Sequence, residues 1–130
     1  MKQYTNESQT DKLIELGFEK PKSVIGYSYP EQSEQQQAYE ASLGLDPYIA
    51  TVDQIEFEYA YSIGELIEML PPKIWDDYAQ IYWELCIDWD IIGNVWRVVY
   101  FHKALMRCYG KELIDALYDM IVKLKEEGVI

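Results

Sequence analysis

Basic residues are scarce in this sequence, and one long stretch has none. Lys and Arg total 11 against 23 Asp and Glu, which gives a formal net charge of −12 at pH 7. No Lys or Arg occurs between Ser23 and Pro72, whereas the same stretch has these carboxylates: Glu31, Glu34, Glu40, Asp46, Asp53, Glu56, Glu58, Glu65 and Glu68. Because binding to a phosphate backbone requires clustered cations, we expect no direct binding to nucleic acid.

Histidine and cysteine are also scarce, which limits the catalytic and metal chemistry open to the chain. His102 is the one histidine, so no metal site can use two His. Cys86 and Cys108 lack the Cys-x-x-Cys spacing of zinc and redox sites. One hypothesis is a small hydrolase that uses Cys108 and His102. It is the least favoured of the three functional hypotheses given in this section, because nothing indicates a group that would orient this pair. We predict two unpaired thiols and no catalytic, cofactor-binding or metal-binding residue.

Three pairs of carboxylates could be imagined as acid–base pairs or as sites for a hard cation. They are Asp76 with Asp77, Glu84 with Asp88, and Asp115 with Asp119. General acid–base catalysis needs a sheltered pair with shifted pKa values, and the spacing of a calcium-binding loop is absent. We interpret all three pairs as solvated surface charge.

Long apolar runs are absent as well. The longest falls far short of the roughly 20 residues that a transmembrane helix needs. The polar start, MKQYTNESQTDK, lacks the apolar core of a signal peptide. We therefore expect a cytoplasmic protein that makes no membrane contact.

Apolar and aromatic residues are plentiful, at 49% and 15% of the chain. Disordered chains have few of either, and 130 residues suit one core, so we predict a single globular domain over residues 1–130. The predicted fold class is α+β, with a small antiparallel sheet centred on a hairpin and packed by two or three helices. Residues 31–44 are rich in Gln and Glu and poor in apolar side chains, and we expect an exposed helix or a partly mobile loop there.

The strongest helical pattern covers residues 111–127. Leu113, Leu117 and Leu124 belong to its broad apolar stripe, and Gly128 suits the left-handed position that follows a helix. Lysines in the last turn favour the helix macrodipole.

Two shorter helices are predicted nearer the N-terminus. One covers residues 8–16, with Ser8 as N-cap and Gly17 at its end. The other begins with a capping box formed by Ser62 and Glu65, and the two prolines after residue 70 end it.

Alternation of apolar and polar residues predicts a hairpin over residues 78–101. In its first strand, 78–89, the odd-numbered residues from 81 onward are apolar and should face the core. In the returning strand, 95–101, we expect Arg97 on the solvent side, with Glu84 or Asp88 as its cross-strand partner. Residues 102–109 should form either a third, irregular strand or a helical turn.

A shorter alternation predicts a half-buried strand over residues 55–59. Glu56 and Glu58 should lie in water, with the apolar positions between them buried.

Short blocks of the sequence resemble a known group of proteins. The blocks are Leu13-x-x-Leu16-Gly17, Tyr61-Ser62 with the helix through Pro71, Trp96-Arg97-Val98-Val99-Tyr100, and the closing helix before Gly128. In this order they resemble small uncharacterised proteins of gut Bacteroides-type bacteria and their phages or mobile elements. The resemblance implies a compact α+β domain and a phage or mobile-element origin. It implies no catalytic residue, because that group has no established activity.

Six of the tyrosines lie in the stretch that lacks cations. Because aromatic side chains are enriched at interfaces, we predict a non-enzymatic accessory or interaction protein with an acidic, Tyr-rich binding face between about Tyr27 and Tyr61. The candidate partner-binding residues are Glu34, Tyr39, Glu40, Glu56, Glu58, Tyr59 and Tyr61. The expected partner is an unknown protein with a basic surface. The alternative hypothesis is an acidic mimic of nucleic acid that inhibits a basic DNA- or RNA-binding protein.

Overall fold

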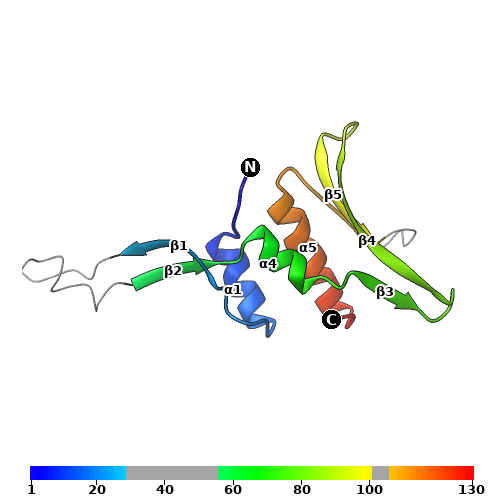
Figure 1. Ribbon diagram of the computed structural model, residues 1–130, viewed down its shortest axis with the longest axis horizontal. Coiled ribbons are helices and arrows are strands. Elements are labelled where there is room, and N and C mark those ends of the chain that lie inside the picture. Colours follow the sequence, from blue (N-terminus) through cyan, green and yellow to red (C-terminus); the bar gives the residue numbers. More distant parts are fainter. Residues whose placement is uncertain (29–55, 101–105) are drawn as a thin grey trace, which may run out of the picture. The chain divides into compact units, whose positions relative to one another are not determined.

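The computed structural model describes residues 1–28, 56–100 and 106–130, except for the side chains of residues 27, 28 and 56. The described elements, in chain order, are α1 (Glu7–Glu15), β1 (Ser23–Ser28), β2 (Glu56–Ala60), α4 (Ile63–Met69), β3 (Lys73–Asp76), β4 (Ile81–Asp90), β5 (Val95–Tyr100), β6 (Arg107–Gly110) and α5 (Leu113–Glu126) (Figure 1). They form an α+β fold with one sheet of two strands and one of four, which confirms the predicted fold class.

The chain divides into two compact units. Unit 1 comprises Met1–Ser23 and Ala60–Ile130, and unit 2 comprises Val24–Tyr59. A single domain over residues 1–130 would require these two units to pack together as one body. That part of the sequence analysis stays a prediction. The predicted exposed or mobile segment, 31–44, lies outside the described residues.

The sheet of unit 1 has the strand order β3-β4-β5-β6, and its strands pair antiparallel. Residues 81–84 of β4 pair with β3, and residues 85–90 pair with β5. The predicted hairpin therefore supplies the two central strands. Of the two alternatives for 102–109, the structure shows a strand at Arg107–Gly110, which pairs with β5.

The two faces of this sheet differ, and the alternation predicted the core-facing side chains in the middle of β4. Ile81 and Trp89, near the two ends of this strand, are 44% and 42% exposed, so their predicted place in the core was wrong. Trp83, Leu85, Ile87, Trp96, Val98 and Tyr100 lie in or against the core. Arg97 points to the other face, where its guanidinium pairs with Asp88 in the opposite register position. We call this second side the outer face.

The predicted start of the hairpin was wrong, because residues 77–80 form a turn between β3 and β4. The Asp76 carboxylate accepts hydrogen bonds from the N–H groups of Tyr78 (3.0 Å) and Ala79 (3.1 Å). Gln80 closes the turn with a φ of 56°. Local side-chain hydrogen bonds of this kind favour turns over extended strands.

Helix α5 packs on β5 and β6, and α4 packs on α5 (Figure 1). The α5 stripe is almost fully buried, as predicted, at Leu113, Ile114, Ala116, Leu117, Met120, Ile121 and Leu124. At its end the N–H groups of Gly128 and Val129 donate to the carbonyls of Lys125 and Leu124. Gly128 has a φ of 73°, the left-handed conformation that was predicted for it.

The two shorter helices are also present, with one correction. The Ser62–Glu65 capping box of α4 is confirmed. The predicted N-cap of α1 was wrong, because Asn6 and not Ser8 caps this helix. The Asn6 side chain accepts from the Gln9 N–H at 2.8 Å, and the Gln9 side chain accepts from the Asn6 N–H at 3.0 Å. Glutamine can complete a capping box as glutamate does, so the helix starts two residues earlier.

Candidate interaction surfaces

The structure separates the residues that were predicted to bind a partner. Glu34, Tyr39 and Glu40 lie outside the described residues, and of Glu56 only the backbone is described. Glu58 and Tyr59 are exposed on β2 in unit 2. Tyr61 is 1% exposed and belongs to the core of unit 1.

Tyr61 has a structural role that explains its burial. Its N–H donates to Thr5 Oγ1 at 3.0 Å, and its hydroxyl donates to the Glu19 carbonyl. Burial, with a smaller effect of the Glu65 charge, raises the pKa of Tyr61. Tyr61 therefore joins the N-terminal segment to α4, and we leave it out of the candidate surface.

The described part of unit 2 is a ribbon of β1 and β2 that exposes large apolar side chains. Val24 is 47% exposed, Ile25 42%, Phe57 53% and Tyr59 46%. Val24 and Ile25 are consecutive, so apolar groups lie on both sides of the ribbon. The expected burial of the apolar β2 positions was therefore wrong at Phe57 and Tyr59. The described residues of unit 2 include no helix that could pack on the ribbon and bury these two side chains.

Two aromatic rings of this ribbon lie near one another. The ring centroids of Phe57 and Tyr59 are 6.5 Å apart, at an interplanar angle of 59°. The carboxylate of Glu58, between them in sequence, would lie 3.5 Å from a Cβ placed on Gly26. We call Val24, Ile25, Phe57, Glu58 and Tyr59 the ribbon surface. It combines exposed apolar groups with negative charge.

A hollow of about 270 Å³ lies beside α4 in unit 1. Its lining residues are Phe18, Glu19, Lys20, Lys22, Tyr61, Glu65, Glu68 and Met69. Glu65 accepts hydrogen bonds from the N–H groups of Lys22 (3.0 Å) and Ser62 (3.2 Å) and from the Ser23 hydroxyl. Burial acts to raise the pKa of Glu65, but these hydrogen bonds outweigh burial and lower it. A carboxylate held ionised by capping contacts is not poised to take up a proton near neutral pH.

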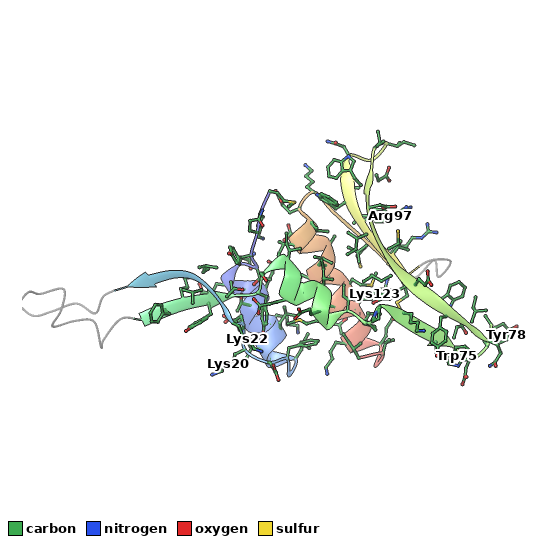
Figure 2. The ribbon with its side chains drawn as sticks, viewed as in Figure 1. Lys20, Lys22, Trp75, Tyr78, Arg97 and Lys123 are labelled. Carbon is green, nitrogen blue, oxygen red and sulfur yellow. The ribbon has the colours of Figure 1, made fainter. Side chains whose placement is uncertain are left out.

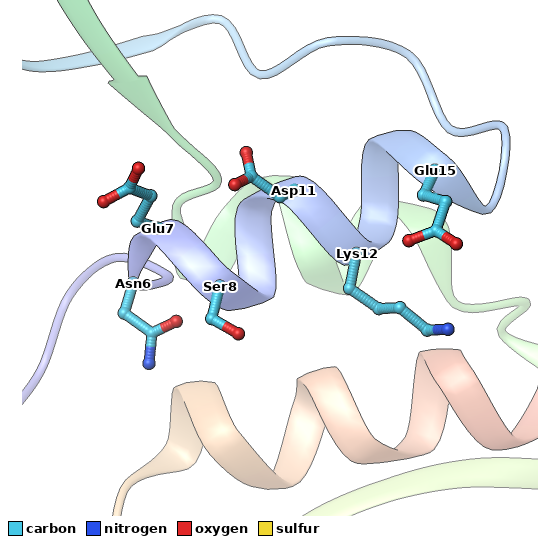
Figure 3. Close-up of a pocket in the computed structure, with 6 residues that line it drawn as sticks. All are labelled: Asn6, Glu7, Ser8, Asp11, Lys12 and Glu15. Carbon is cyan, nitrogen blue, oxygen red and sulfur yellow. The ribbon is translucent and has the colours of Figure 1, made fainter.

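A second hollow runs along one side of α1 (Figure 3). Its lining residues are Asn6, Glu7, Ser8, Asp11, Lys12 and Glu15, and all but the partly exposed Lys12 are exposed. These side chains come from one helix and its N-cap, so they form a solvated helix face.

Four of the six carboxylates in the three pairs take part in structural contacts. Asp77 accepts from the Trp75 indole at 2.8 Å, and Asp76 accepts from the Trp83 indole at 2.7 Å. Asp88 pairs with Arg97, whose hydrogen bonds lower the Asp88 pKa. Asp115 binds the Lys2 ammonium at 3.1 Å. Burial and the nearby Asp115 charge raise the pKa of Asp119.

The two thiols lie on opposite faces of the four-stranded sheet. Cys86 lies opposite Val99, and Cys108 lies opposite Val98. Burial raises the pKa of Cys108, which disfavours the reactive thiolate. His102 lies outside the described residues, so the Cys108–His102 hypothesis stays a prediction. Among the described residues no group of three metal-ligating side chains occurs.

The sequence did not indicate a cluster at the β3–β4 end of the sheet. Trp75 and Tyr82 pack edge to face with centroids 4.9 Å apart, and the Lys73 ammonium lies 4.3 Å from the Tyr82 ring centroid. Tyr78 at the turn is fully exposed, and Figure 2 shows it with Trp75, away from Arg97. The four residues Lys73–Asp76 do not alternate between apolar and polar and are too few to predict a strand.

The sequence matches no protein-family model, no curated protein and no solved structure. The resemblance to the Bacteroides-type group therefore stays a prediction. Among the described helices, none has the length and apolar character that crossing a membrane requires.

Proposed function

We propose that this protein is a non-enzymatic interaction module whose ribbon surface binds a basic partner protein. The observation that carries the proposal is the exposure of four large apolar side chains on β1 and β2. Large exposed apolar side chains with polar neighbours are typical of a protein interface, and here they lie on both sides of the ribbon. The phage or mobile-element origin implied by the resemblance belongs to this proposal as well.

The charge of the surrounding sequence supports a basic partner. The 50 residues from Ser23 to Pro72 contain nine carboxylates and no Lys or Arg. Such a stretch attracts cationic surfaces and repels acidic ones, so charge would select the partner and speed its encounter. The apolar side chains would then supply contacts that persist when salt screens the charges.

The test compares capture of partner proteins from host lysate by the wild type and by two charge-reversed variants. The ribbon variant changes Glu34, Glu40, Glu56 and Glu58 to Lys. The matched control changes Glu7, Asp11, Glu15 and Glu126 to Lys, all exposed carboxylates of unit 1. Both variants change the net charge by the same amount. We expect the ribbon variant alone to lose the partner, and equal capture by all three proteins would contradict the proposal.

The acidic stretch also supports the alternative proposal, mimicry of nucleic acid. A mimic would bind a basic DNA- or RNA-binding protein in competition with DNA. Its binding would collapse between about 0.05 and 0.2 M salt, because displaced counterions dominate such complexes. Partner capture that survives at the higher salt favours the interaction module over the mimic.

A further inference from the structure

One edge of β4 is open over residues 87–90. The Leu85 N–H donates to the Pro72 carbonyl at 3.0 Å, so odd-numbered residues of β4 direct their backbone groups toward the side of β3. β3 begins at Lys73, opposite Glu84, and the chain before it leads back to α4. In the described chain, therefore, no strand lies beside Ile87 or Trp89 on that side.

The backbone N–H and C=O groups of Ile87 and Trp89 thus form a short edge that can accept another strand. The opposite edge of the same residues is paired with β5. Unpaired strand edges are templates for an added extended chain, and natural proteins usually cover or blunt them. Pro71 and Pro72 keep the protein's own β3 from extending along this edge, because proline has no N–H to donate.

The side chains along the edge differ on the two faces of the sheet. On the outer face the charged side chains of β4 itself are acidic: Glu84, Asp88 and Asp90. Arg97 pairs with Asp88 and Lys73 lies opposite Glu84, so Asp90 is the acidic residue of this face without a cation opposite it in the register. On the helix-facing side it has Ile87 and Trp89, and Trp89 is 42% exposed. The loop that follows adds two exposed side chains, Ile91 at 85% and Ile92 at 99%.

This pattern selects among possible occupants of the edge. A second copy of the chain would place acidic residues of one β4 beside those of the other, and like charges in adjacent strands are destabilising. The chain's net charge of −12 adds to this repulsion. An extended segment with cations on one face and apolar side chains on the other would match both faces.

We propose that residues 87–90 of β4 bind an extended, alternately basic and apolar segment of a partner protein by addition of a strand. This site lies in unit 1 and does not involve the ribbon surface, so it goes beyond the function proposed above. Backbone hydrogen bonds would supply binding, and the alternation of side chains would supply specificity.

The first test is amide hydrogen exchange in the protein alone. The N–H groups of Ile87 and Trp89 should exchange much faster than those of Cys86 and Asp88, which point toward β5. Uniform protection of all four in a monomer would contradict an open edge. Protection of Ile87 and Trp89 together with dimerisation, measured by sedimentation, would replace the proposal with a pairing of two copies.

The second test uses a synthetic eight-residue peptide of alternating Lys and Val, titrated at about 0.05 M salt. Binding should slow exchange at Ile87 and Trp89. Two control peptides separate the contributions: one replaces Lys by Glu, and the other keeps Lys and Val but methylates alternate backbone nitrogens. We expect each control to bind at least about tenfold more weakly. Equal binding of the methylated peptide, or no binding of the parent peptide, would overturn the proposal.

A matched pair of variants tests the backbone donor itself. Trp89→Ala removes the ring and keeps the outward N–H, whereas Trp89→Pro removes both. The proline variant should bind the Lys–Val peptide more weakly than the alanine variant, and equal binding would contradict strand addition. If the proline variant does not fold, the methylated peptide still decides the question.

Discussion

At the residue scale, two glycines end helices in a conformation that other residues adopt with strain. Gly17 has a φ of 96° and Gly128 a φ of 73°, and nothing lies within 4 Å of a Cβ built on either. The strain of an added Cβ is therefore confined to the backbone. Gly17→Ala and Gly128→Ala should each lower the free energy of unfolding by about 1–2 kcal/mol.

Gly64 is the matched control for these substitutions. It lies in α4 without positive φ, and a Cβ there would be an ordinary 3.8 Å from Ser62 Oγ. Gly64→Ala should raise the free energy of unfolding by about 0.5 kcal/mol. Urea denaturation measures all three variants, and the same sign of change in all of them would contradict the assignment of left-handed caps.

Glu65 gives the fold a pH dependence of known sign. Hydrogen bonds lower the folded-state pKa of Glu65 below its ordinary value of 4.5, despite the opposing effect of burial. A group with a lowered pKa stabilises the fold above its unfolded pKa and loses that contribution as pH falls through the folded pKa. Wild type should therefore lose more stability than Glu65→Gln as the pH falls from about 5 to 3.

Glu68→Gln is the control for this prediction, because Glu68 lines the same hollow. Its free energy of unfolding, measured by denaturation at each pH, should follow the wild-type profile. A Glu65→Gln profile that coincides with wild type throughout this range would show that the capping contacts do not hold the carboxylate ionised.

At the element scale, Asp76 organises the β3–β4 turn. Its carboxylate binds the N–H groups of Tyr78 and Ala79 and the indole of Trp83. Asp77 nearby is exposed and accepts from the Trp75 indole. Asp76→Ala should lower the free energy of unfolding by about 1–3 kcal/mol, because several donors lose their acceptor.

The same substitution at Asp77 provides the comparison. Asp77→Ala should change the stability by less than about 0.5 kcal/mol, since water can replace its contact at an exposed site. Denaturation followed by tryptophan fluorescence measures the free energy of unfolding of both variants. Equal effects of the two substitutions would contradict the role given to Asp76.

The elements that could be predicted from the sequence are those with a long period or a clear cap. The α5 stripe, the Ser62–Glu65 capping box and the alternation in β4 each repeat or pair a signal over several residues. β3 was missed because four residues do not establish a period. Tyr78 falls within the predicted strand 78–89, but the Asp76 contacts that make a turn there depend on three-dimensional geometry.

The candidate surface was less predictable than the fold. Alternation showed that Phe57 and Tyr59 share one side of β2, but it could not show whether another element covers that side. Tyr61 follows the same tyrosine-rich pattern and is buried, because its hydroxyl and N–H have partners far away in sequence. Composition identifies a stretch that suits an interface, and only packing separates its surface residues from its core residues.

At the scale of the whole molecule, the protein combines a packed core with two exposed features. The core of unit 1 joins α1, α4, α5 and the four-stranded sheet. The ribbon surface lies in unit 2, and the open edge of β4 lies in unit 1. Both features suit basic partners, since the chain's net charge is −12. Variants in one feature leave the other unchanged, so the two proposals can fail separately.

The measurement that tests the central claim most directly is partner retention by a variant that keeps every charge. Phe57→Ser combined with Tyr59→Ser removes two exposed rings from the ribbon surface, and Tyr78→Ser removes a fully exposed ring from unit 1. Capture at about 0.15 M salt, where charges beyond roughly 8 Å are screened, isolates the apolar contribution. We expect the double variant to lose the partner and Tyr78→Ser to retain it. Full retention by the double variant would contradict a binding role for the ribbon surface.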